Sequence, residues 1–172
     1  MRTLLNIKLI IIGFIFAAST SAVHAVEVSI PEITADANEV IEIPINISEV
    51  KGIFSIELTL EYDAEIIVLG GVRSTDLTKN FLQASNVVSP GKLLISLASA
   101  GIFNGKGTIL IILAKVRDKT PSGKFSPLNL TTAQLNEGMI EATVKNGKII
   151  VGKGVAVNKL KGKLTNWGKI KS

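Results

Sequence analysis

The chain has 172 residues, no cysteine and a single histidine, His24. Beyond residue 25, this composition excludes disulfide bonds, zinc sites built on histidine or cysteine, and catalytic pairs of histidine with serine or cysteine. The net charge of +5 is uneven: residues 26–144 carry nine basic and all fourteen acidic side chains, whereas residues 145–172 carry eight lysines and no acid. We therefore expect a mildly acidic domain with a basic tail, and no nucleic-acid partner.

The first 25 residues have the composition of a secretory signal peptide. Two basic residues precede an apolar run at 9–18, and Val23-His24-Ala25 supplies the small residues that a signal peptidase reads. Ten helical residues cover about 15 Å, roughly half of a bilayer core, so the run favours a cleaved signal over a membrane span. We expect cleavage after Ala25, with Ala22 as the alternative, and a secreted, extracellular or cell-surface protein.

Residues 26–151 contain runs rich in β-branched residues, separated by Gly, Pro and Asn turn signals. The expected strands are 26–30, 40–47, 54–62, 66–72, 81–88, 92–98, 108–116, 126–129, 134–136, 142–145 and 148–151. Pro44 cannot donate to a ladder, so we expect it at an edge or a bulge. Asn146-Gly147 predicts a two-residue hairpin. Short strands without helical segments between them predict an all-β, antiparallel β-sandwich.

The segment 54–62 has the clearest pattern in the chain. Apolar residues alternate with polar ones, which is typical of a strand with one buried and one solvated face. The segment ends in Tyr62-Asp63, and a second apolar run, 66–69, follows. A strand that ends in Tyr-Asp before a short apolar strand resembles the core motif of cohesin domains, the receptor modules that bind dockerins in cellulosomes and related assemblies.

The resemblance extends over nearly all of residues 26–151. Gly105-Lys106-Gly107, which leads into the apolar run 108–116, is similar to the family's entry into its long central strand. Pro121-Ser122-Gly123 and the closing run 147–151 also match in order and spacing. The resemblance implies a jelly-roll sandwich of about nine strands, and a non-catalytic module that binds a dockerin-bearing protein.

The strand 92–99 offers two faces, and composition alone does not choose between them. One face holds Leu93, Ile95, Leu97 and Ser99, and the other holds Leu94, Ser96 and Ala98. Matched to cohesins, the first set is the exposed one. The resemblance then implies a partner-binding surface with an aliphatic centre and a polar rim, made of Ser55, Glu57, Thr59, Asn86, Val88, Leu93, Ile95, Leu97 and Ser99.

Two residues depart from the pattern of cellulosomal relatives. Ser55 stands where a larger amide is common, and Ala100 stands where an acid is common. Both changes weaken the polar rim, so the chain resembles a non-cellulosomal member. A dockerin partner is the main expectation. An unknown protein partner at the same face, and a face that binds nothing specific, are the alternatives.

Other function classes find less support in the sequence. A carbohydrate-binding jelly-roll module would need exposed aromatic side chains, yet residues 26–172 hold one Tyr and one Trp. An Ig-like adhesin module is a further alternative. Glu61, Asp63 and Glu65 lie close together in sequence, but they lack the spacing of a calcium loop, and we expect no catalytic residues, metal or cofactor.

The segment 152–172 is predicted to be a tail outside the domain. Leu160, Leu164, Trp167 and Ile170 are spaced three or four apart among lysines, which is a membrane-surface pattern, but Gly162 and Gly168 weaken a helix. Three interpretations stay open: a disordered solubilising or linking tail, a weak electrostatic contact with an anionic cell surface, and an element docked on the domain.

Overall fold

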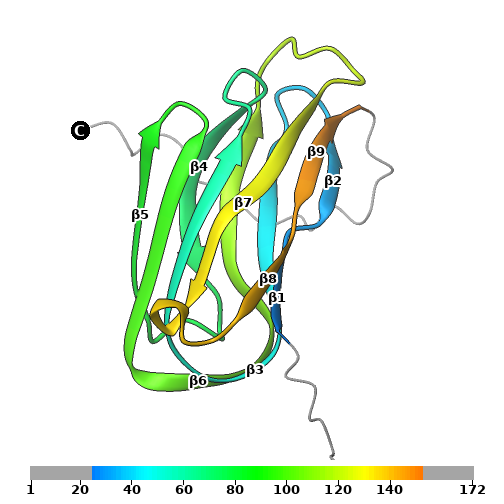
Figure 1. Ribbon diagram of the computed structural model, residues 1–172. Helices are drawn as coiled ribbons and strands as arrows, with labels where there is room; N and C mark the ends of the chain where they lie inside the picture. Colours follow the sequence, from blue (N-terminus) through cyan, green and yellow to red (C-terminus); the bar gives the residue numbers. More distant parts are fainter. Residues whose placement is uncertain (1–24, 153–172) are drawn as a thin grey trace, which may run out of the picture.

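Two β-sheets pack face to face in the part of the chain that the computed structural model describes, residues 25–152 (Figure 1). The strands are β1 (Val26–Ser29), β2 (Glu32–Ala35), β3 (Val40–Tyr62), β4 (Ile67–Ser74), β5 (Leu82–Ser89), β6 (Lys92–Val116), β7 (Phe125–Leu135), β8 (Ala142–Lys145) and β9 (Gly147–Val151). One turn of 3-10 helix, η1 (Asn136–Gly138), follows β7. Within this range no helix is long and apolar enough to cross a membrane. The predicted signal peptide up to His24, and the predicted tail from Lys153, lie outside the described residues.

The strands β3 and β6 are long because each belongs to both sheets. They pair antiparallel from Val40↔Lys115 to Glu61↔Lys92, with register shifts in the middle of β3. Both strands bend at the lower end of Figure 1. Near the register shifts, Gly52 of β3 and Gly105 and Gly107 of β6 have φ of 75°, 132° and 129°. Glycine adopts such angles readily, so the chain turns by bulges and glycines without leaving the ladder. The four strands predicted at 40–47, 54–62, 92–98 and 108–116 are therefore two.

The two halves of β3 and β6 organise the remaining strands. The front sheet runs β5, the first half of β6, the second half of β3, β7, β9 and β2. The back sheet runs β4, the second half of β6, the first half of β3, β1 and β8. Most pairs are antiparallel, as predicted, but β1–β8 and β2–β9 are parallel.

The hairpin predicted at Asn146-Gly147 is wrong, because β8 and β9 lie in different sheets. The chain crosses between the sheets there, alongside the crossing from β1 to β2 at Pro31. A Cβ on Gly147 would collide with the carbonyl oxygens of Ile30 and Pro31, so the glycine permits two chain segments to approach closely. The Asn146 Oδ1 accepts a hydrogen bond of 2.9 Å from the Leu130 N–H.

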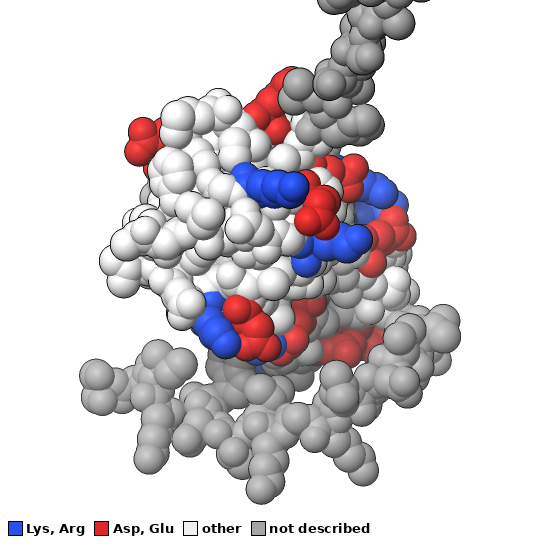
Figure 2. All heavy atoms as spheres, turned by 90° about the horizontal axis from the view of Figure 1, so that it is seen from below, with Lys and Arg blue, Asp and Glu red and all other residues white. Residues whose placement is uncertain are grey.

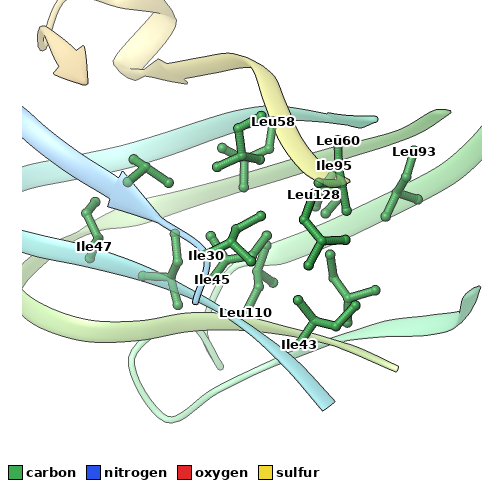
Figure 3. Packing of buried hydrophobic residues seen from close by; sticks show 14 of the residues in the cluster. Ile30, Ile43, Ile45, Ile47, Leu58, Leu60, Leu93, Ile95, Leu110 and Leu128 are labelled. Atoms are coloured by element: carbon green, nitrogen blue, oxygen red, sulfur yellow. The ribbon is translucent and has the colours of Figure 1, made fainter. Parts of the chain in front are cut away.

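Isoleucine and leucine side chains fill the space between the sheets. Figure 3 shows side chains of the back sheet (Ile43, Ile45, Ile47 and Leu110) facing side chains of the front sheet (Leu58, Leu60, Leu93, Ile95 and Leu128), together with Ile30 from the crossing between the sheets. Each such side chain contributes about 1.5–3 kcal/mol on burial, which stabilises a fold without disulfide bonds.

The placement predicted for Pro44 is confirmed. It pairs with Ile111 of β6, while β1 pairs with β3 only at Ile47 and Asn46, so Pro44 lies where β3 has one strand neighbour. A register shift follows at Ile45/Asn46. The missing proline N–H therefore removes no bond that a second neighbour would need.

Candidate partner-binding surface

The orientation of β6 decides which of its side chains can meet a partner. Leu93, Ile95 and Leu97 are only 3, 2 and 1% exposed, and Figure 3 shows the first two between the sheets. The prediction that these three residues form the exposed aliphatic centre is therefore wrong. The core needs the bulkier of the two sets, and a shift of one residue along a strand exchanges its faces.

The outward face of the front sheet follows from its strand register. Four rows cross the strands in the order β5, β6, β3 and β7: Leu82–Ala98–Ser55, Ala84–Ser96–Glu57–Gln134, Asn86–Leu94–Thr59–Thr132 and Ser89–Lys92–Glu61–Asn129. We call these fifteen residues the outward surface. Neighbours in a row lie about 5 Å apart, so the rows form one continuous surface.

The outward surface is apolar at one side and polar at the other. Leu82 and Leu94 are 82 and 39% exposed, and they lie on β5 and β6 beside the exposed Ala84 and Ala98. Polar side chains occupy β3 and β7. Glu57 is the exposed charge within the first three rows, and the fourth row ends the surface with the Glu61–Lys92 ion pair of 3.4 Å.

Several residues predicted for the site do belong to this surface. Glu57 and Asn86 are exposed there, and Ser55 is half-buried. Thr59 lies in the third row but is only 8% exposed, because Leu94 and Thr132 flank it on both sides. Whether these residues contact a partner stays a prediction.

The last two predicted residues lie at the margins. Val88 is 47% exposed at a register shift that separates Val87 from Ser89, so it has no partner position on β6. Ser99 lies on the same side of β6 as Leu97, but it is only half-buried, where the strand begins to bend. Its hydroxyl accepts a hydrogen bond of 3.1 Å from the Gly101 N–H, which is a local turn role.

Sequence reasoning missed the residues that form the apolar side. Leu94, Ser96 and Ala98 form the face of 92–99 that the family resemblance places inward, and Leu82 and Ala84 of 81–88 are outside the predicted site. The signal that could have found the three residues of β6 is the ordinary rule that the larger set of a two-faced strand packs inward. On β5 this rule fails, because the exposed Leu82 belongs to the bulkier set.

The side chain of Asn136 holds the β3 end of the outward surface in place. Its Oδ1 accepts hydrogen bonds from the N–H groups of Phe54 (2.9 Å) and Ser55 (3.2 Å), and its Nδ2 donates to the Gly52 carbonyl (2.7 Å). Asn136, Glu137 and Gly138 have φ of 50°, 59° and 87°, which turns the chain sharply after β7. One buried amide therefore satisfies three backbone groups at the β3 bend.

The acidic residues around Tyr62-Asp63 have structural partners. Glu61 pairs with Lys92, and the Asp63 Oδ1 accepts a hydrogen bond of 2.8 Å from the Glu65 N–H. The Asp63 N–H in turn donates to the buried Ser126 Oγ at 2.9 Å. Across residues 25–152, no group of three or more His, Cys, Asp or Glu is placed to hold a metal ion.

The family model for the cohesin domain matches residues 26–151, the same range that folds into the sandwich. The chain belongs to the cohesin domain family. A search of curated proteins found no match.

Solved structures of cohesins have the same fold. The sixth cohesin of Acetivibrio cellulolyticus scaffoldin B, in complex with the Cel5 dockerin, has a TM-score of 0.67 at 18% identity, over 75% of this chain and 100% of that one. The solution structure of CaCohA2 from Clostridium acetobutylicum has a TM-score of 0.65 at 21% identity, over 74 and 90%. A non-cellulosomal cohesin from the archaeon Archaeoglobus fulgidus has a TM-score of 0.64 at 19% identity, over 75 and 92%. These similarities confirm the jelly-roll sandwich of about nine strands.

Proposed function

We propose that this cohesin-family chain is a secreted, non-catalytic binding module, and that it holds a dockerin-type partner on the outward surface of its front sheet. The observation that carries the proposal is Leu94. It is a large apolar side chain, 39% exposed, in the third row of a sheet whose opposite face is packed core. Its neighbours across the strands are the polar Asn86 and Thr59. A flat surface with apolar anchors and a polar rim is typical of protein–protein interfaces.

The chemistry of the surface limits what the partner presents. The side formed by Leu82, Ala84, Leu94 and Ala98 favours an apolar ridge, such as one face of a helix. Glu57 favours an N–H donor or a cation opposite it, because a carboxylate that loses water in an interface needs a charge-assisted bond. No residue in the four rows is aromatic. A sugar-stacking platform therefore finds no support on this surface.

The proposed cleavage after Ala25 would leave the start of the domain intact. Val26, the first residue of β1, is 7% exposed, and its N–H donates to the Glu141 carbonyl at 2.9 Å. Cleavage after Ala25 would convert this N–H into an ammonium group that can still donate the same bond. Export at that position is therefore compatible with an intact β1.

The test is titration calorimetry with dockerin modules encoded in the same genome. Leu94→Asp should weaken binding by at least about a hundredfold, because it removes a central apolar anchor and buries a carboxylate. Val68→Asp is the matched control, since Val68 is similarly exposed (45%) but lies on β4 in the other sheet. Val68→Asp should bind normally.

If the folded Leu94→Asp variant bound the dockerin with the same affinity as the unchanged protein, the assignment of this surface would be overturned. An absence of binding by the unchanged protein to every dockerin tested would overturn the dockerin-type partner.

A further inference from the structure

Four strands lie at sheet edges in residues 25–152, and three of them carry features that prevent pairing with another chain. β2 and β8 have four residues each, and they contain Glu32 and Lys145. β4 has a register shift at Leu69/Gly71, and its Arg73 pairs with Glu42 at 2.6 Å. Short length, charge and bulges are the usual protections of an edge strand.

The edge strand β5 lacks most of these protections. Its eight residues, LQASNVVS, include no charged residue and no proline, and seven of them are exposed. It pairs with β6 in unbroken register from Leu82 to Val87, and a shift comes only at Val87/Ser89. In the view along the sandwich from below, most of the surface on the β5 side is formed by uncharged residues (Figure 2). A regular, uncharged edge is open to a further strand.

The side chain of Gln83 keeps this edge in place. Its Nε2 donates to the Val72 carbonyl at 2.8 Å, and its Oε1 accepts from the Ser74 hydroxyl at 2.9 Å. Both partners belong to β4, so Gln83 ties β5 to the back sheet. β5 is therefore already held in strand conformation, and pairing with a further strand would cost little conformational entropy.

We propose that β5 is a self-association strand, which pairs antiparallel with β5 of a second copy of this chain about a two-fold axis at Ser85. A two-fold axis perpendicular to the sheet places one residue opposite its own copy. Centred on Ser85, it sets Ala84 opposite Asn86 and Gln83 opposite Val87 in each half. It also brings Leu82, which is 82% exposed, close to the exposed Val88 of the other copy, twice.

A second copy is the occupant that the charges of the edges favour. Because β5 has no charge, two copies of it meet without repulsion. By contrast, an edge that carries one sign of charge, such as β8 with Lys145, opposes its own copy. The resulting front sheet continues across both copies, with the two outward surfaces on the same side. The inference is independent of the proposed function, since the pairing needs no dockerin.

The test uses charge at the symmetry axis and is read by sedimentation velocity from low micromolar to near-millimolar protein. The unchanged protein should show a monomer–dimer equilibrium. Ser85→Lys and Ser85→Glu should each raise the dimer dissociation constant by about tenfold or more, because the two substituted residues lie directly opposite each other with Cβ atoms roughly 5 Å apart, and their like charges repel. An equimolar mixture of the two variants should form dimers again. Thr143→Lys on β8, which adds the same charge at another exposed edge, should leave dimerisation unchanged.

Any of three results would overturn the proposal. The unchanged protein could stay monomeric throughout the concentration range, or Ser85→Lys could leave the dimer dissociation constant unchanged. In the third case, the mixture of the two folded variants would stay monomeric. Measuring dockerin binding by the Ser85→Lys variant at low protein concentration separates this proposal from the proposed function. Ser85 is opposite Ile95 and points away from the outward surface, so that binding should be retained.

Discussion

The side-chain amide of Asn136 should contribute several kcal/mol to the free energy of unfolding, although Asn136 lies outside the outward surface. Substitution by alanine leaves the N–H groups of Phe54 and Ser55 and the carbonyl of Gly52 without this partner. Each orphaned group costs about 1 kcal/mol at such a partly buried position. Alanine also tolerates a φ of 50° less well than asparagine, which adds about 1 kcal/mol.

We therefore expect Asn136→Ala to lower the free energy of unfolding by about 4 kcal/mol. For a domain of this size, that corresponds to a fall of roughly 10–20 °C in the melting temperature. The assay is thermal and urea unfolding followed by circular dichroism. Asn38→Ala is the matched control, since Asn38 has a φ of 67° at an exposed position, and it should cost only about 1 kcal/mol.

The comparison separates the two contributions. A loss near 4 kcal/mol for Asn136→Ala against about 1 kcal/mol for Asn38→Ala would assign the difference to the three hydrogen bonds. Equal losses in the two variants would refute the reasoning, because the backbone angle alone would then explain both.

Three further predictions concern the core, the crossing of the chain and the N-terminus. Leu97→Asp should unfold the domain, since it puts an unpaired carboxylate at a 1% exposed position. Leu94→Asp should change the melting temperature by only a few degrees, and a melting assay in which Leu94→Asp is the more damaging variant would contradict the orientation of β6. Gly147→Ala should lower the free energy of unfolding by at least about 2 kcal/mol, because the carbonyls of Ile30 and Pro31 are backbone and cannot yield, while Gly123→Ala, which meets open space, should cost about 1 kcal/mol in urea unfolding. N-terminal sequencing of the exported protein should begin at Val26, and an uncleaved N-terminus would contradict the signal peptide.

Most of the fold could be predicted because local patterns and turn chemistry agree with it. The alternation in 54–62 identified the buried Ile56, Leu58 and Leu60 correctly. The joined strands β3 and β6 could not be predicted, because a bulge with glycines and a loop with glycines have the same composition. The strand β2 was missed for a related reason: four residues after Pro31 are too few for a period to be recognised.

The candidate site was predicted in part. The polar residues of β3 were placed on the correct face because an apolar partner set alternates with them. On β6 both faces contain leucine, so the pattern was ambiguous, and the orientation taken from the family resemblance was wrong by one residue. The role of Asn136 was invisible in the sequence, because its three hydrogen-bond partners lie more than eighty residues away.

The central claim is that a dockerin-type partner occupies the outward surface of the front sheet. Backbone amide chemical shifts of the isotope-labelled protein, recorded while a dockerin is added, test this claim most directly. The account predicts that the largest changes cluster at Glu57, Leu94 and Ser96, with little change at Val68 on β4. Changes concentrated on β4 and β8, without changes at Leu94 and Ser96 of β6 or at Ser55 and Glu57 of β3, would contradict it.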